Sequence, residues 1–207
     1  MRVLLVNGSP HKNGTTMAAL SEIASELSLE GVEAEIFWIG AQPIRGCIGC
    51  GKCGGNSKCA FEDSVNEFIS KAADFDGFVF GTPVHYAAAS GQLTSFMDRA
   101  FYAGGKDIFR LKPAAAIAVA RRGGCTGAFD QLNKYFAITE MPIVSSVYWN
   151  MVFGSNGEQA KMDKEGMDTM KALARNMAYL LKLRKAGDEA GLKPPKPIKK
   201  EFTNFIR

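Results

Sequence analysis

Short apolar runs of strand length alternate along this chain with longer segments in which apolar residues recur at helical spacing. This alternation is typical of a parallel β-sheet covered by helices on both faces. We expect five strands, at Arg2–Asn7, Glu33–Ile39, Gly77–Gly81, Ala114–Ala120 and Ile143–Tyr148. The intervening helices are expected at Thr16–Glu30, Asp63–Ala73, Gln92–Ala103, Thr126–Phe136 and Met167–Ala186, with Gly187 ending the last of them.

The chain shows no internal repeat, and its 207 residues are enough for one core of good size. We therefore expect one α/β domain over residues 1–190, followed by a tail over residues 191–207. The tail is rich in Lys and Pro but ends in EFTNFIR, and free tails seldom end in spaced aromatic residues. We interpret it as an extended segment that docks on a neighbouring subunit.

Composition and charge exclude several classes of protein. A hydrophobic content of 46% and a charged content of 22% are those of an ordinary globular protein. The net charge of +4 is mild, and Lys and Arg are scattered as far as the tail, which argues against a dedicated nucleic-acid-binding protein. No apolar stretch approaches the roughly 18 residues of a membrane span or has the form of a secretory signal. We therefore expect a cytoplasmic protein that binds neither nucleic acid nor membrane.

The turn after the first strand places small and hydroxyl-bearing residues directly before a helix, in the segment SPHKNGTT. Unpaired backbone N–H groups converge where a helix begins, and the helix dipole favours negative charge there. The turn has neither the GxGxxG pattern of dinucleotide-binding domains nor the GxxxxGK[ST] pattern of the P-loop. We interpret it as a phosphate site, with an ordinary β–α turn as the alternative. Its candidate ligands are Ser9, His11, Asn13, Gly14, Thr15 and Thr16.

This segment resembles the GSPRxxGNT loop of the NADPH-dependent FMN reductase and multimeric flavodoxin family, in which the loop wraps the 5′-phosphate of flavin mononucleotide (FMN). His11 stands where Arg is common and Thr15 where Asn is common, and both replacements keep a donor. The segment TPVHYAAASGQLTSFMDR, residues 82–99, resembles the family's SPVYxxxxSGxLKxFxDR. The resemblance covers most of residues 1–180. It implies a flavodoxin-like three-layer sandwich with a five-stranded parallel sheet in the order 2-1-3-4-5.

The resemblance also implies which loops contact the flavin ring. In an open parallel sheet, ligands bind beyond the carboxyl ends of the strands where the strand order reverses. In the flavodoxin-like order, the loops after the first and third strands adjoin that place. A further Arg-x-Gly-Gly element of the family resembles the turn after the fourth strand, for which a surface turn with solvated arginines is the alternative. The residues implied are Pro83, Val84, His85, Tyr86, Arg121, Gly123 and Gly124.

We nominate no side chain as catalytic, because flavin chemistry belongs to the cofactor. The alternative of His85 as a proton donor rests on a lone histidine, which is more often a structural or surface residue. Trp149 and Asn150 are interpreted either as a wall of the active-site cleft, completed across a dimer, or as interface residues. Cys125 is expected to be inert, since nothing near it in the sequence marks a thiolate.

Four cysteines, Cys47, Cys50, Cys53 and Cys59, have the spacing C-x2-C-x2-C-x5-C. In a reducing compartment such crowding favours a metal or redox role over a disulfide frame. The run departs from the usual ferredoxin pattern. It resembles the compact motif of the iron–sulfur flavoproteins, a branch of the same family, in which the four cysteines hold a [4Fe–4S] cluster that relays electrons to FMN. A zinc site, a thiol–disulfide switch and a structural loop without metal stay open as alternatives.

We therefore interpret the sequence as that of an FMN-dependent oxidoreductase, with NAD(P)H as co-substrate and a small-molecule acceptor or a ferredoxin-like donor as partner. The resemblance implies a homodimer or homotetramer. Two hypotheses compete with this interpretation. One is a flavodoxin-type electron carrier or redox sensor that serves a protein partner. The other is an FMN-binding relic that acts as an interaction module.

Overall fold

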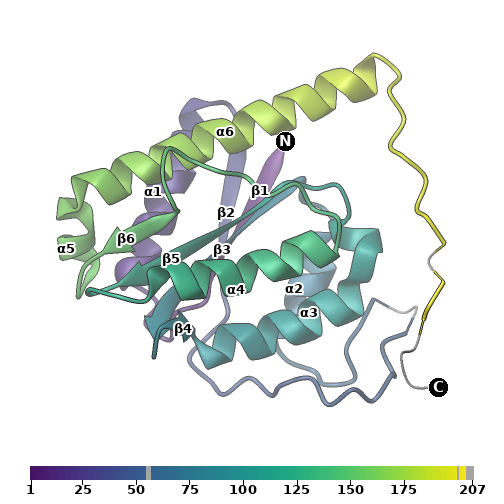
Figure 1. The fold of residues 1–207 in the computed structure, drawn as a ribbon, viewed down its shortest axis with the longest axis horizontal. Helices are drawn as coiled ribbons and strands as arrows, with labels where there is room; N and C mark the ends of the chain where they lie inside the picture. The colour runs from purple at the N-terminus through teal and green to yellow at the C-terminus, as the bar shows by residue number, and fades with distance from the viewer. Residues whose placement is uncertain (55–56, 200, 204–207) are drawn as a thin grey trace.

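The computed structural model describes residues 1–54, 57–199 and 201–203. Its central sheet has the strand order β2-β1-β3-β5-β6, with every neighbouring pair parallel (Figure 1). A short strand, β4, lies off this path and pairs antiparallel with the end of β3. The predicted order of the five main strands is thereby confirmed. The strands are β1 (Arg2–Asn7), β2 (Glu33–Trp38), β3 (Gly77–His85), β4 (Ala88–Ala89), β5 (Ala114–Ala120) and β6 (Met151–Phe153).

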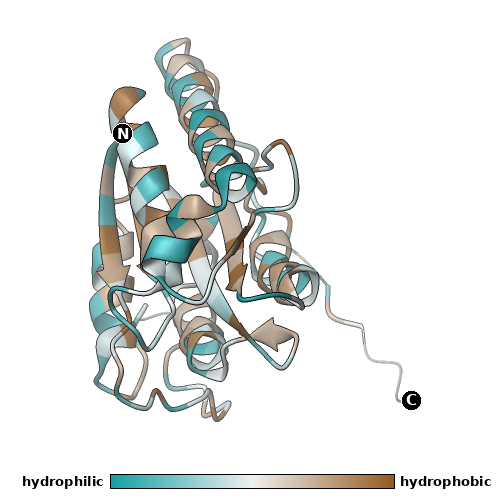
Figure 2. Ribbon diagram, turned by 90° about the vertical axis from the view of Figure 1, so that its left-hand side faces the viewer, coloured by the Kyte–Doolittle hydropathy of each residue, from teal (hydrophilic) through white to brown (hydrophobic). Residues whose placement is uncertain are grey.

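Two layers of helices enclose the sheet, as expected for a flavodoxin-like sandwich (Figure 1). The helices α1, α5 and α6 contribute to the core on one face, and α2, α3 and α4 contribute to the core on the other. Hydrophobic residues concentrate on the strands between these layers, while polar residues lie on the outer faces of the helices (Figure 2). The helices are α1 (Thr15–Leu29), α2 (Ser64–Ala72), α3 (Gly91–Phe109), α4 (Cys125–Ile138), α5 (Gly157–Met162) and α6 (Lys164–Glu189).

The central strands are apolar on both faces because each face carries a helix layer. In β1, Leu4 and Val6 belong to the core under α2 and α3, while Val3 and Leu5 belong to the core under α1 and α6. All four side chains are fully buried. Side chains alternate between the faces of a strand, so a continuous apolar run supplies both cores at once.

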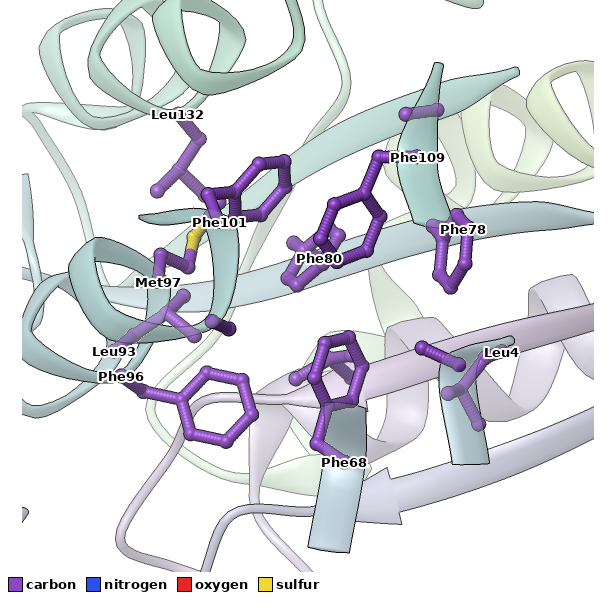
Figure 3. Close-up of a cluster of buried hydrophobic side chains, with 14 of the residues drawn as sticks. Leu4, Phe68, Phe78, Phe80, Leu93, Phe96, Met97, Phe101, Phe109 and Leu132 are labelled. Atoms are coloured by element: carbon purple, nitrogen blue, oxygen red, sulfur yellow. The ribbon is translucent and has the colours of Figure 1, made fainter. Parts of the chain in front are cut away.

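A cluster of phenylalanines fills the core on the face covered by α2, α3 and α4 (Figure 3). The rings of Phe68 and Phe96 meet edge to face at 5.1 Å, and those of Phe101 and Phe109 stack at 4.5 Å. On the same face, β5 contributes only alanines, at positions 114, 116 and 118. Large rings opposite small side chains fill the space at the density of a protein interior.

The last strand lies later in the chain than the sequence predicts. Within residues 143–148, which the structure describes in full, Ile143 alone forms a bridge, to Ala114, and β6 pairs instead with the end of β5. Between these two places the chain leaves the sheet edge, and the side-chain amide of Asn150 donates to the carbonyl oxygen of Ala116 at 3.0 Å. The β-branched residues of 143–148 indicate a preference for extended structure, but they do not specify which residues meet the edge.

Two helices are longer than predicted. Helix α3 continues beyond Ala103 to Phe109, although Gly105 interrupts it with non-helical angles (φ 53°, ψ −157°). Helix α6 continues past Gly187 and ends at Glu189. The left-handed residue that follows is Gly191, whose φ of 81° most side chains avoid. A glycine inside a helix costs about 1 kcal/mol relative to alanine, which a long packed helix tolerates. The short elements β4 and α5 were not predicted.

After α6 the chain turns and the tail runs as an extended segment along one side of the domain (Figure 1). Its described residues, 192–199 and 201–203, are exposed and have no regular secondary structure. The predicted docking of the tail rests partly on positions 200 and 204–207, which lie outside the described residues. None of the helices in the described part of the chain is long and apolar enough to cross a bilayer.

Candidate functional site

The turn between β1 and α1 is folded by its own polar side chains. Asn7, fully buried at the end of β1, accepts from the N–H of Ser9 at 3.0 Å and donates to the carbonyl oxygen of Lys12 at 3.1 Å. The hydroxyl oxygen of Ser9 accepts from the N–H of His11 at 3.1 Å, which leaves the hydroxyl hydrogen of Ser9 available to a ligand. Sequence reasoning missed Asn7, which is the residue that gives the turn its shape.

Helix α1 begins at this turn without a capping side chain. Its N-cap is Gly14, in extended conformation, and no described side chain accepts from the first-turn N–H groups. Thr15 donates its hydroxyl to the carbonyl oxygen of Gly154 at 3.4 Å, and Thr16 is 1% exposed. An uncapped helix beginning leaves N–H groups that an anion can satisfy, with support from the helix dipole.

The residues of this turn line a pocket of about 510 Å³ at the carboxyl ends of β1, β3 and β5. Every predicted phosphate ligand lines it, together with three of the predicted ring-contacting residues. They are Ser9, His11, Asn13, Gly14, Thr15, Thr16, Pro83, Val84 and Arg121. The structure thus brings together segments that are far apart in the sequence, at the edge where parallel-sheet proteins bind ligands.

The remaining wall of the pocket was not predicted. It consists of the end of β5 and the β6–α5 turn, namely Val119, Ala120, Gly154, Ser155, Asn156 and Gly157. The signal that was available is the Gly-Ser-Asn-Gly run, which repeats the small, hydroxyl-bearing character of the first turn. The predicted strand at Ile143–Tyr148 ends several residues before β6, so the sequence does not place this run at the end of a strand.

Four predicted ring contacts do not line this pocket: His85, Tyr86, Gly123 and Gly124. The two-residue turn between β3 and β4 holds Tyr86 and Ala87 at positive φ, 51° and 60°, and leaves the Tyr86 side chain fully exposed. A bulky residue in this conformation is strained. The hairpin packs on the beginning of α4, where a Cβ on Gly124 would lie 2.7 Å from the Cα of Ala87. Gly124 therefore has a packing role at this contact.

Ser90 joins the third strand, the phosphate turn and α3. Its hydroxyl donates to the carbonyl oxygen of Gly8 at 3.1 Å, and its N–H donates to the hydroxyl of Thr82 at 3.0 Å. Gly8 is required there, because a Cβ would lie 2.7 Å from Leu93 and 2.8 Å from the carbonyl oxygen of Gly81. These contacts hold the turn after β1 against the segment after β3, which keeps two walls of the pocket in register.

The described parts of the cysteine-containing segment, residues 40–54 and 57–63, contact helix α3. At its beginning, Gln92 of α3 donates to the carbonyl oxygens of Gly40 at 2.7 Å and Gln42 at 3.1 Å. Farther along, all four predicted metal ligands line one small pocket, of about 20 Å³, with Arg99 and Tyr102 of α3. All four are free thiols; two are exposed, one is half-buried and one is buried. Cys47 and Cys50 are the exposed pair, Cys59 is half-buried and Cys53 is buried.

The placement of the four cysteines bears on whether they suit a zinc ion or an iron–sulfur cluster. Within the described ranges, no group of three or more His, Cys, Asp or Glu side chains is close enough to hold a metal ion. A zinc site requires its sulfur atoms about 2.3 Å from a single point. A cubane cluster instead carries its iron atoms at separate corners, so its thiolates surround a space rather than a point. The four cysteines line one pocket and are residues that both groups accept as ligands, but their sulfur atoms are not gathered into a metal site among the described residues.

Two other sequence candidates lie outside the large pocket. Asn150 is buried and serves the sheet edge, while Trp149 is 52% exposed and packs against Tyr148 at a ring distance of 4.8 Å. The interpretation of Asn150 as a wall of the cleft is therefore wrong. Cys125, at the beginning of α4, is buried, and burial raises the pKa of its thiol to about 11. A thiol with that pKa is protonated at neutral pH, in keeping with the expected inertness.

Comparison with known proteins agrees with this geometry. The model of the NADPH-dependent FMN reductase family matches residues 1–156. An iron-sulfur flavoprotein of Methanocaldococcus jannaschii is 29% identical over 192 residues, which are 89% of this chain and 100% of the relative. RosB, solved with bound 8-demethyl-8-formylriboflavin-5′-phosphate, has a TM-score of 0.71 at 12% identity and covers 100% of this chain and 92% of its own. An archaeal flavodoxin has a TM-score of 0.59 at 14% identity, with 88% and 99% covered.

The two solved structures establish the flavodoxin-like fold, and the family match extends over most of the chain. It includes the turns after β1, β3 and β5 that form the large pocket, as well as the cysteine-containing segment. The predicted resemblance and the predicted class of enzyme, an oxidoreductase of the NAD(P)H-dependent flavin type, are confirmed at the level of the family. Because the match spans the elements that build the site as well as the sheet beneath it, this protein belongs to the NADPH-dependent FMN reductase family.

Proposed function

We propose that this protein binds FMN in the pocket at the carboxyl ends of β1, β3 and β5 and acts as an FMN-dependent oxidoreductase that takes electrons from NAD(P)H. The observation that supports this most directly is the uncapped beginning of α1, which faces a pocket of about 510 Å³. Pockets of roughly 300–1,000 Å³ are typical of cofactor sites. The donors in this pocket therefore suit a ligand with a phosphate at one end and a larger group beyond it.

The phosphate end of the ligand is assigned to the turn before α1. The first-turn N–H groups and the hydroxyls of Ser9 and Thr16 are donors, and an anion accepts from all of them. Ser9 and Thr16 are 4% and 1% exposed, so hydrogen bonds to them form in a site largely shielded from water. The exposed Arg121 at the rim adds positive charge that attracts phosphate-bearing ligands.

The ring end of the ligand is assigned to the side of the pocket lined by β3 and β5. Pro83 and Val84 from β3 and Val119 and Ala120 from β5 present mainly apolar surface there. When bound, FMN supplies the hydride and electron chemistry itself. The residues of this chain bind and orient the ring and limit the access of water, and no side chain is required as a nucleophile.

We further propose that Cys47, Cys50, Cys53 and Cys59 hold a [4Fe–4S] cluster that exchanges electrons with the flavin. Four thiols around one pocket, without nitrogen or oxygen ligands among them, form a donor set that zinc and iron–sulfur clusters both accept, and the relative that is an iron-sulfur flavoprotein supports the cluster. The segment that carries them begins at Gly40, directly after β2, and β2 neighbours β1. It therefore starts at the same edge of the sheet as the proposed flavin pocket.

A carrier that serves a protein partner is the second candidate, favoured by the surface over the cysteines. Ile48 and Tyr102 line the cysteine pocket and are 64% and 62% exposed. Exposed apolar side chains beside a redox group suit brief contact with another electron-transfer protein. A ferredoxin-like protein is the partner we propose for that mode, and a quinone-type or other small acceptor is the partner for the enzyme.

The binding proposal is tested by titrating the apoprotein with FMN and with riboflavin under anaerobic conditions. We expect FMN to bind at least tenfold more tightly, because charge-assisted hydrogen bonds to the phosphate are among the stronger ones. Ser9→Ala should reduce this preference, whereas Ser145→Ala, on an exposed segment away from the pocket, should not. Apoprotein without affinity for FMN would overturn the proposal.

Turnover separates the enzyme from the carrier. NAD(P)H oxidation in the presence of quinone, nitro or azo acceptors should be catalytic if the enzyme proposal is right. Absence of turnover with either nicotinamide, together with rapid electron exchange with ferredoxin, would identify the carrier. An absorbance spectrum of anaerobically purified protein shows in the same preparation whether flavin and cluster are present.

We also propose that the protein is a homodimer or homotetramer and that the tail beyond residue 190 docks on a neighbouring subunit. The exposed Trp149 and Tyr148 beside the β6 edge are candidates for that contact. Sedimentation of the full chain and of a chain ending at Ala190 tests both statements. A smaller assembly for the shortened chain is expected, and an unchanged assembly would contradict the role of the tail. A cytoplasmic location stays a prediction.

A further inference from the structure

Arg99 is a buried arginine whose five N–H groups all have acceptors. Its side chain is 1% exposed, and it is the largest fully buried side chain among the described residues. The two terminal nitrogens make four hydrogen bonds and Nε makes one, at distances between 2.5 and 3.2 Å. Burying an arginine is costly unless its charge and its donors are all compensated. This one meets that condition.

The acceptors belong to the two ends of the cysteine-containing segment. Before the cysteines, the carbonyl oxygen of Arg45 accepts at 3.2 Å. After them, the carbonyl oxygen of Phe61 accepts at 2.9 Å, and both carboxylate oxygens of Asp63 accept, at 2.5 and 2.9 Å. Asp63 is also the N-cap of α2, where it accepts from the N–H of Val65. One guanidinium group from α3 therefore connects the entry of the segment, its exit and the helix that follows.

The fifth hydrogen bond goes to a cysteine. Nε of Arg99 donates to Sγ of Cys59 at 3.2 Å. The carboxylate of Asp63 and the carbonyl oxygens of Arg45 and Phe61 accept four of the five hydrogen bonds, and these four would be enough to connect the two ends of the segment. The remaining donor is directed at one of the four sulfur atoms that line the cysteine pocket, a pocket that Arg99 itself also lines. In the same pocket Cys47 and Cys50 are exposed and Cys53 is buried, whereas the half-buried Cys59 is the cysteine whose sulfur accepts from Arg99.

We propose that Arg99 is the positioning residue of the cysteine site: it ties Arg45, before the cysteines, to Phe61 and Asp63 after them, and it holds the sulfur of Cys59 toward the pocket through an N–H···S hydrogen bond. The inference rests on the proposed role of the four cysteines as cluster ligands. Partners that orient metal ligands commonly matter for affinity almost as much as the ligands do. Hydrogen bonds to ligand sulfur also raise the reduction potential of a cluster, because they stabilise its more electron-rich state.

The first test needs no cluster and uses the full chain with FMN but without iron. Amide hydrogen exchange, read by mass spectrometry, is compared between the native chain and the variant Arg99→Lys, which keeps a positive charge but loses the planar fork of donors. Exchange in peptides from residues 45–63 should become at least tenfold faster, while peptides from β1, β3 and β5 stay unchanged. Lys52→Gln is the matched control, because it removes an exposed cation from the same segment. Equal exchange in Arg99→Lys and the native chain would overturn the proposal.

A second pair of variants leaves Arg99 in place, which matters if its substitution prevents folding. In the iron-free chain, Cys59→Ser keeps an acceptor for Nε–H, whereas Cys59→Ala removes it. We expect exchange in residues 45–63 to be faster in the alanine variant than in the serine variant. The pair Cys47→Ser and Cys47→Ala, at an exposed position, should show no such difference. No difference at Cys59 would mean that the N–H···S bond does not hold the loop.

The third readout is the midpoint potential of the anaerobically reconstituted protein, followed by electron paramagnetic resonance. Arg99→Gln should shift the potential of the cluster to a more negative value than in the native chain or Lys52→Gln, and an unchanged potential would overturn the N–H···S contribution. The outcomes distinguish this inference from the proposed function. If the native chain takes up no iron but shows the expected exchange differences, the cluster is contradicted and the positioning role of Arg99 is supported. Iron uptake with no exchange difference contradicts the positioning role of Arg99 alone.

Discussion

The indole N–H of Trp38 donates to the carbonyl oxygen of Ser9 at 2.8 Å. This hydrogen bond joins the end of β2 to the turn after β1, so the neighbouring strand supports the proposed phosphate site from outside. Lys12 lies on the same side, with its ammonium group 5.6 Å from the centre of the Trp38 ring. The shape of the turn therefore depends on a residue 29 positions away in the sequence as well as on its own side chains.

We expect Trp38→Phe to weaken FMN binding about fivefold, because losing one hydrogen bond at a partly buried carbonyl costs about 1 kcal/mol. The fold should persist, since phenylalanine replaces most of the apolar contact. Fluorescence titration of the apoprotein measures the effect. Trp149→Phe, at a half-exposed site outside the pocket, is the control and should bind FMN like the native chain. Identical dissociation constants for both variants would show that the turn does not need Trp38.

The hydroxyl of Thr16 should discriminate between FMN and riboflavin. Thr16→Val keeps the shape of the side chain, whose methyl group packs close to Gly81. Without the hydroxyl donor, FMN affinity is expected to fall about tenfold, while riboflavin affinity stays unchanged. Isothermal titration with both ligands checks this, and Thr126→Val, in the exposed first turn of α4, is the control. An equal loss for both ligands would argue that Thr16 acts on the fold and not on the phosphate.

Adjacent glycines offer a test of the hairpin contact. Gly124 has φ +92°, and a Cβ there would lie 2.7 Å from Ala87, whereas a Cβ on Gly123 would meet nothing within 4 Å. Gly124→Ala should therefore lower the free energy of unfolding by more than about 1 kcal/mol, and Gly123→Ala should be nearly neutral. Urea denaturation of both variants measures the difference. Equal stability would show that the turn between β3 and β4 moves away at no cost.

Burial of Cys125 should make stability fall at alkaline pH. Burial raises the pKa of its thiol from 9.0 to about 11, so between these values the unfolded chain has lost the proton while the folded chain retains it. The free energy of unfolding must therefore decrease as pH rises through about 9 to about 11. Cys125→Ala removes this contribution, and its stability should fall less steeply over the same range. Parallel pH profiles for the variant and the native chain would contradict the prediction.

The alternation of apolar runs and helical segments was enough to predict an α/β sandwich and most of its strands and helices, because strands buried on both faces and amphipathic helices leave a local signature. The strand order came from the family resemblance. The turn before α1 was recognisable for the same reason: Ser9 and Gly14 precede the helix by a few residues and Thr16 lies in its first turn, while its binding of phosphate stays a prediction. The four cysteines were also recognisable, since their spacing is short and unusual.

Contacts between distant segments could not be predicted in this way. The wall formed by residues 154–157 reaches the phosphate turn only because β6 lies two places from β3 in the sheet, and Thr15 meets Gly154 across 139 residues of sequence. The position of Asn150 likewise depends on a distant segment, because its side-chain amide donates to the carbonyl oxygen of Ala116 in β5.

The sequence by itself thus determined the class of fold and the family, and it predicted anion binding at one turn. The tertiary structure decided which residues complete the pocket and that Arg99 closes the cysteine loop. The physical reason is that helix beginnings and turns are stabilised by interactions within a few residues, whereas a site built from several segments depends on the order in which the strands pair. That order sets which distant donors and acceptors come within hydrogen-bonding distance.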